Sequence, residues 1–130
     1  METIDRTFKY EIYYRENKNW LESIAFYQHE LDYFKGLLKD LMSKNTESVF
    51  QNQAKIVRNH LQDWAVKFEI ILQEITREQW GYEDDAEGKD FLLGEEIYTR
   101  HINIRIKYHD AEKGFIEIKH NFYDFVSKYI

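Results

Sequence analysis

Apolar and ring-bearing residues recur in the last third of the chain at steps that alternate between four and three. The series is Ile97, His101, Ile104, Tyr108, Ala111, Phe115, Ile118, Phe122, Phe125 and Tyr129. Such steps place side chains along one stripe of an α-helix, the seam by which long helices pack lengthwise. The pattern predicts a helix over about residues 90–129.

Two earlier stretches carry the same alternation. The first seam is Trp20, Ile24, Tyr27, Leu31, Phe34, Leu38 and Leu41, and the second is Phe50, Ala54, Val57, Leu61, Trp64, Phe68, Ile71 and Ile75. They predict helices over about residues 10–43 and 46–80. Asn45 or Thr46 is suited to cap the second helix. The connection between these two helices is very short, which makes them antiparallel neighbours.

The first 16 residues support two interpretations. Phe8, Tyr10, Ile12 and Tyr14 alternate with polar residues, as in a short strand. Tyr10, Tyr13, Asn17 and Trp20 instead continue the helical seam backwards. Because a lone strand would have no partner in this chain, we favour a helix from about residue 10, after a loosely ordered segment 1–9.

Two further features set the number of helices. Residues 81–89 contain two glycines and four acids and are expected to form an acidic loop. Gly114 is a site where the last helix could break, which would add a fourth element, but the seam passes through it in register. The expected fold is all-α, a single domain of residues 1–130 built as an antiparallel bundle of three long helices, or four if the N-terminus or a break near Gly114 adds one.

Composition narrows the classes of function. The chain has no proline and no cysteine, so long uninterrupted helices are allowed and disulfides and thiolate metal sites are excluded. A net charge of −6 disfavours binding to a phosphate backbone, so no nucleic acid is expected as a partner. We see no signal peptide and no membrane-spanning run, so no membrane association is expected, and the expected location is cytoplasmic.

Apolar residues also lie outside the seams, on all three helices. They are Phe26, Tyr33, Ile56, Ile70, Ile102, Ile116 and Tyr123. In a three-helix bundle each helix faces two neighbours, so these residues could simply widen the apolar face. They could instead form an interface with another chain, because exposed apolar stripes mark such surfaces.

Candidate chemistry is sparse. Of the five histidines only His101 lies on a seam, with Tyr108 seven residues on, and the pair marks a ligand-binding or polar centre. A hydrogen bond from His101 to a tyrosine or glutamate of another helix is the simpler interpretation. The Glu-x-x-His unit at Glu117–His120 occurs once, with His120 turned toward solvent, whereas a di-iron bundle needs two such units. We therefore expect no metal site and no cofactor.

The sequence favours a non-enzymatic interaction module that self-associates or docks a partner protein through the apolar residues outside its seams, with a homo-oligomer as the expected state. The alternative is a metal- or ligand-binding bundle, or an enzyme, that uses a polar centre near His101 and Tyr108.

Overall fold

The chain forms three long helices. The computed structural model describes residues 2–86 and 94–130, and the side-chain surroundings of residues 8–81 and 96–130. The helices are α1 (Glu2–Lys44), α2 (Ser48–Ala86) and α3 (Gly94–Ser127). The described residues contain no strand. The predicted all-α bundle of three helices is confirmed.

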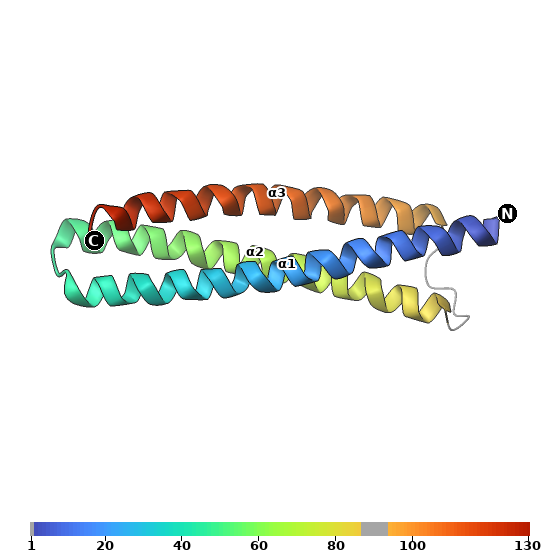
Figure 1. The fold of residues 1–130 in the computed structure, drawn as a ribbon, viewed down its shortest axis with the longest axis horizontal. Helices are drawn as coiled ribbons and strands as arrows, with labels where there is room; N and C mark the ends of the chain where they lie inside the picture. The colour runs from blue at the N-terminus through green and yellow to red at the C-terminus, as the bar shows by residue number, and fades with distance from the viewer. Residues whose placement is uncertain (1, 87–93) are drawn as a thin grey trace.

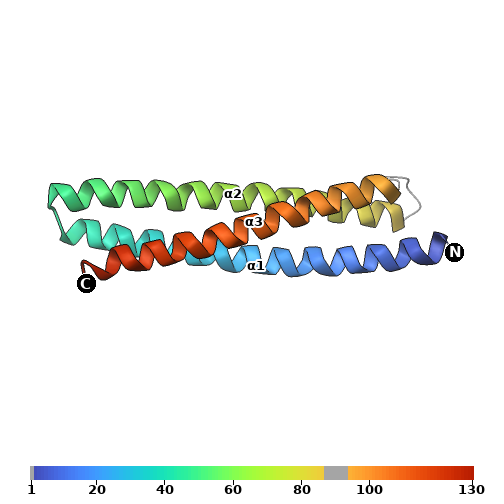
Figure 2. The same ribbon diagram turned by 90° about the horizontal axis from the view of Figure 1, so that it is seen from above.

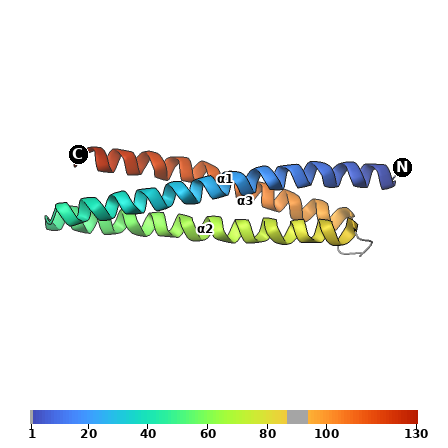
Figure 3. The ribbon, with the colours of Figure 1, turned by 60° about the horizontal axis from the view of Figure 1, so that its bottom comes forward.

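The helices lie side by side along one long axis (Figure 1). α2 returns antiparallel to α1, and α3 then runs parallel to α1. Seen from above, α3 passes obliquely over the other two, from α1 near the C-terminus to α2 at the other end (Figure 2). A third view shows the same oblique crossing between α1 and α3 (Figure 3). Each helix therefore touches both others.

The seams form the core. Leu31, Leu38, Leu61, Phe68 and Ile75 have no more than a trace of exposed surface, and the seam of α3 buries Ile104, Phe115 and Phe122. Aromatic rings join the helices: Phe34 stacks on Phe122 with ring centroids 4.6 Å apart. A few predicted seam residues, among them Val57, Ile118 and Phe125, are half-buried.

Hydrogen bonds from polar side chains to the backbone hold the short connection between α1 and α2 in place. The Asn45 side-chain oxygen accepts a hydrogen bond from the backbone N–H of Glu47 at 3.1 Å, in the turn just before α2. The Glu47 carbonyl accepts the first helical bond of α2, from the Gln51 N–H, so Glu47 is the N-cap and the prediction of Asn45 or Thr46 was wrong. The Gln51 amide donates to the carbonyl oxygens of Met42 and Asn45, each at 2.7 Å. These bonds satisfy carbonyl groups that a helix end leaves unpaired.

The helix ends differ from the prediction. α1 begins at Glu2, so the expected loosely ordered segment 1–9 was wrong from residue 2 onward, and so was the strand alternative. The seam continues backwards through the buried Asn17 and Tyr13, so α1 packs against the bundle upstream of Trp20. α2 continues to Ala86, so residues 81–86 of the expected loop are helical. The rest of that loop, residues 87–89, lies outside the described residues.

α3 passes through Gly114 without a break, as the unbroken seam predicted. A Cβ atom at Gly114 would lie 2.3 Å from the Trp64 indole. The missing side chain therefore makes room for the indole at the contact between α2 and α3.

Candidate functional site

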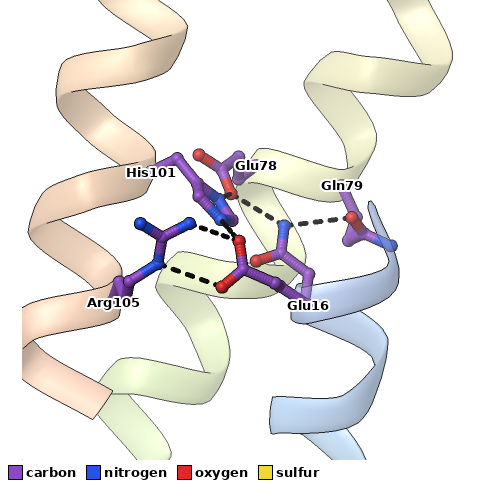
Figure 4. A network of polar contacts seen from close by, with 6 residues as sticks. Glu16, Glu78, Gln79, His101 and Arg105 are labelled. Carbon is purple, nitrogen blue, oxygen red and sulfur yellow. Dashed lines mark hydrogen bonds and ion pairs between the residues drawn. The ribbon is translucent and has the colours of Figure 1, made fainter. Parts of the chain in front are cut away.

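Two features of the bundle stand apart from an ordinary apolar core. The first is a buried polar layer near the N-terminal end of α1, made of Glu16 and Asn17 of α1, Glu78 and Gln79 of α2, and His101 and Arg105 of α3 (Figure 4). The second is an exposed apolar face along α1 and α3, defined below.

His101 is the centre of the polar layer. Its side chain is fully buried, its Nδ1 lies 2.9 Å from Glu78 Oε2, and its Nε2 lies 2.9 Å from Glu16 Oε1. The ring stacks against Tyr13, with centroids 3.9 Å apart, and against Trp20 at 5.1 Å. This agrees with the simpler interpretation of His101, a hydrogen bond to a glutamate of another helix.

A carboxylate oxygen lies within hydrogen-bond distance of each nitrogen of the ring, one from α1 and one from α2. Arg105 is the permanent cation of the layer and donates to both oxygens of Glu16. This ion pair partly compensates the charge of Glu16, and buried charges are tolerated when they are paired.

The contacts of Glu16 within the layer lower the pKa of its carboxyl group. Burial raises the pKa of Glu16, but hydrogen bonds from Arg105 and His101 outweigh burial, so the pKa lies below its ordinary value. Glu16 keeps 29% of its side-chain surface exposed, whereas Glu78 has none. Glu16 is thus the outer carboxylate of the layer and Glu78 the inner one.

The layer holds polar groups that its own side chains do not satisfy. Asn17 donates to Glu78 Oε2 at 2.7 Å and to Gln79 at 3.1 Å. Among the described residues, Asn17 Oδ1 and Glu78 Oε1 are buried without a hydrogen-bond partner. An unpaired buried acceptor costs roughly 1–3 kcal/mol of stability, so these two oxygens destabilise the core at this layer.

Tyr108, the other predicted member of the polar centre, belongs to a separate group. Its hydroxyl donates to Glu112 at 2.8 Å, and Tyr27 donates to the same oxygen at 2.7 Å. Burial and the hydrogen bond to Glu112 raise the pKa of Tyr27 above its ordinary value. Trp20 stacks on both His101 and Tyr108, so aromatic rings connect the two groups.

The arrangement leaves His101 no free nitrogen for a metal or a substrate. In the part of the chain that the structure describes, no cluster of histidine and acidic side chains has the geometry of a metal site. His120 is exposed, as predicted, and so are His29, His60 and His109.

Contacts between α1 and α3 keep a constant register. Glu16 and Arg105 are 89 positions apart. Glu30 and Lys119, which form an ion pair of 2.7 Å, have the same separation. The two parallel helices therefore stay in step from the polar layer to the middle of the bundle.

Most of the large exposed apolar residues of α1 and α3 follow this register. In four pairs, the two residues are separated along the chain by one position more than Glu16 and Arg105 are. These pairs are Phe8 and Tyr98, Ile12 and Ile102, Phe26 and Ile116, and Tyr33 and Tyr123. Seven of these side chains are 43–64% exposed, and Ile102 is half-buried. We call these eight residues the α1–α3 face. The Glu30–Lys119 ion pair bridges the helices between its last two pairs.

Five of the seven predicted interface residues belong to this face. The other two, Ile56 and Ile70, lie on α2, where Ile70 lines a groove of about 310 Å³ between α2 and α3 with Trp64 and Lys107. The sequence analysis did not predict Phe8, Ile12 and Tyr98 of the α1–α3 face. Phe8 was missed because the helix was expected to begin only near residue 10.

The chain matches no protein-family model, no curated protein and no solved structure. None of the described helices combines the length and the apolar character needed to cross a membrane.

Proposed function

We propose that the protein is a non-enzymatic bundle that self-associates, with the α1–α3 face of one copy packed against the same face of a second copy. The observation that carries this proposal is the double row of exposed apolar pairs in constant register along two parallel helices. Exposed apolar residues that gather along one side of a helix pair are typical of interaction surfaces. The proposed location remains the cytoplasm.

The length and symmetry of the face support a second copy as its occupant. From Phe8 to Tyr33 the row spans roughly 38 Å of helix, at about 1.5 Å per residue. Homo-oligomers most often form two-fold interfaces in which the same patch serves both subunits. A face that every copy carries meets this condition without a further protein.

The centre of the face suggests where the two-fold axis lies. Asn19 and His109 have the same separation as the four apolar pairs and fall near the midpoint of the row. Both are exposed. A single polar position within an apolar interface fixes register in helical assemblies. We place the axis beside this polar pair.

A cross-link tests this arrangement in a chain that has no cysteine of its own. Asn19→Cys should give a covalent dimer with a short thiol-reactive cross-linker. Val66→Cys is the matched control, because Val66 is also exposed but lies on α2, outside the face. Equal cross-linking of both variants, or of neither, would contradict the proposal. A stable monomer that binds another protein through this face would point to a hetero-partner instead.

The alternative of a metal- or ligand-binding bundle centred on His101 and Tyr108 has less support. Both nitrogens of His101 are occupied by carboxylates, and the Tyr108 hydroxyl is committed to Glu112.

A further inference from the structure

The two helices of the α1–α3 face carry the same order of residue types along it. On α1 the order is Ile12, Arg15, Asn19, Glu22, Phe26 and Tyr33, and on α3 it is Ile102, Arg105, His109, Glu112, Ile116 and Tyr123. Each member of the α1 series is separated from its α3 counterpart by the same number of positions. Both helices therefore have an arginine before the polar centre of the face and a glutamate after it.

The charged residues of α1 lie on the same surface as its apolar ones. Arg15, Asn19 and Glu22 line one shallow groove on α1, and Asn19 and Glu22 line another together with Phe26. Arg15 keeps 75% of its side-chain surface exposed, and Glu22 is exposed as well. Arg15 forms an ion pair with Glu11 of the preceding turn, but exposed pairs of this kind hold a side chain only weakly. Arg15 and Glu22 are therefore accessible to a second chain.

Two copies that pack through the same face are related by a two-fold axis in the plane between them. An axis along the helices makes the copies parallel and places α1 of each copy on α3 of the other. An axis across the helices makes the copies antiparallel and places α1 on α1 and α3 on α3. The charges of the repeated pattern distinguish these two arrangements.

The parallel arrangement brings two glutamates together. Because α1 and α3 stay in step, Glu22 of one copy would lie at the level of Glu112 of the other. Glu112 accepts hydrogen bonds from the hydroxyls of Tyr27 and Tyr108, which bring no positive charge to it. Like charges that face each other across an interface are unfavourable. The repeated pattern therefore disfavours parallel copies.

The antiparallel arrangement brings opposite charges together. With the axis beside Asn19 and His109, Arg15 lies four positions before the polar centre and Glu22 lies three positions after it. Each Arg15 then meets Glu22 of the other copy, with an offset along the helix of about 1.5 Å. The two-fold axis produces this pair twice.

The apolar residues next to the polar centre match across the same axis. Ile12 and Phe26 lie seven positions before and after Asn19, so Ile12 of each copy meets Phe26 of the other. On α3, Ile102 and Ile116 lie seven positions before and after the polar centre in the same way. One axis position therefore pairs apolar residues with apolar residues on both helices.

We propose that two copies of the chain pack antiparallel through the α1–α3 face, with Arg15 of each copy paired to Glu22 of the other. The two-fold axis runs across the helices at the level of Asn19 and His109. This inference rests on the proposed self-association and adds to it the orientation of the copies and the charges that select this orientation.

Reversal of the charge at Glu22 has opposite effects in the two arrangements. In the antiparallel dimer, Glu22→Arg places an arginine opposite Arg15 of the other copy, and we expect the dissociation constant to rise roughly ten-fold. In a parallel dimer the new arginine would face Glu112, and the dissociation constant would fall. Sedimentation equilibrium at low ionic strength measures the change, because salt screens exposed charges. An unchanged or lower dissociation constant would overturn the proposal.

An exchange of the two charges tests the pair directly. Arg15→Glu with Glu22→Arg restores opposite charges across the antiparallel interface, so we expect it to recover most of the wild-type affinity. A double variant that binds no tighter than Glu22→Arg would overturn the pairing of Arg15 with Glu22.

A matched control makes the same change of net charge outside the face. Asp63 is exposed on α2, and Asp63→Arg should leave the dissociation constant unchanged. A ten-fold rise for Asp63→Arg as well would overturn the assignment of the effect to the α1–α3 face. A wild-type chain that stays monomeric at every concentration would instead overturn the proposed function, and this arrangement with it.

Discussion

The Nδ1 atom of His101 lies 2.9 Å from Oε2 of Glu78, and neither side chain has any exposed surface. Removal of the ring alone would leave the buried Glu78 side chain without this hydrogen-bond partner and open a cavity, and large-to-small changes of this kind in a core typically cost about 2–5 kcal/mol. We expect His101→Ala to lower the free energy of unfolding by about 3 kcal/mol. Denaturant unfolding followed by circular dichroism measures it.

The control for that substitution is His60→Ala, because His60 is exposed on α2. It should change stability by no more than about 0.5 kcal/mol. Equal effects of the two substitutions would show that the buried contact between His101 and Glu78 contributes nothing to stability.

The acid limit of stability should depend on Glu16. Its folded-state pKa lies below the ordinary value, so ionised Glu16 stabilises the fold above that ordinary value, and this contribution is lost as the pH falls through the folded pKa. Glu16→Gln should cost on the order of 1 kcal/mol at neutral pH and less in acid. A loss that is the same at neutral and acidic pH would contradict this assignment.

Two glycines within helices should respond in opposite directions to alanine. At Gly36 a Cβ meets nothing within 4 Å, so Gly36→Ala should stabilise the protein by about 1 kcal/mol through helix propensity. At Gly114 the Cβ would lie 2.3 Å from the Trp64 indole. The indole must move, and overpacking of this kind typically costs about 1–3 kcal/mol. Thermal unfolding and tryptophan fluorescence measure both effects, and stabilisation by Gly114→Ala would contradict the packing.

Charges placed on the α1–α3 face should disrupt self-association and leave the bundle folded. Ile116 and Tyr123 are 48% and 43% exposed, so Ile116→Glu with Tyr123→Glu should keep the helical signal and lower the native mass. Val66→Glu places one carboxylate on α2 and should leave the mass unchanged. Dissociation by Val66→Glu, or a double variant that keeps the wild-type mass, would place the interface elsewhere.

Much of the fold was predictable because the seams repeat without interruption. The steps of four and three fix which stripe of each helix is buried, and the short connection at residues 45–47 fixes the hairpin. The start of α1 was missed because the alternation of Phe8, Tyr10 and Ile12 imitates a strand. In the structure, Phe8 and Ile12 lie on the exposed face of a helix.

The polar layer was only half predictable. Asn17 and His101 occupy seam positions in the sequence, and one more step of three beyond Ile75 reaches Glu78, so three polar seam residues were visible. Their meeting was not, because it depends on the register between helices far apart in the chain. Glu16 and Arg105 lie off the seams, and only the structure shows that they join His101.

The most direct test of self-association is the native mass of the unmodified protein, measured by light scattering on a sizing column over a concentration series. One chain has a mass of 16.0 kDa. We expect a dimer that persists on dilution and dissociates only at the lowest concentrations. A mass of one chain throughout the series would contradict self-association through the α1–α3 face.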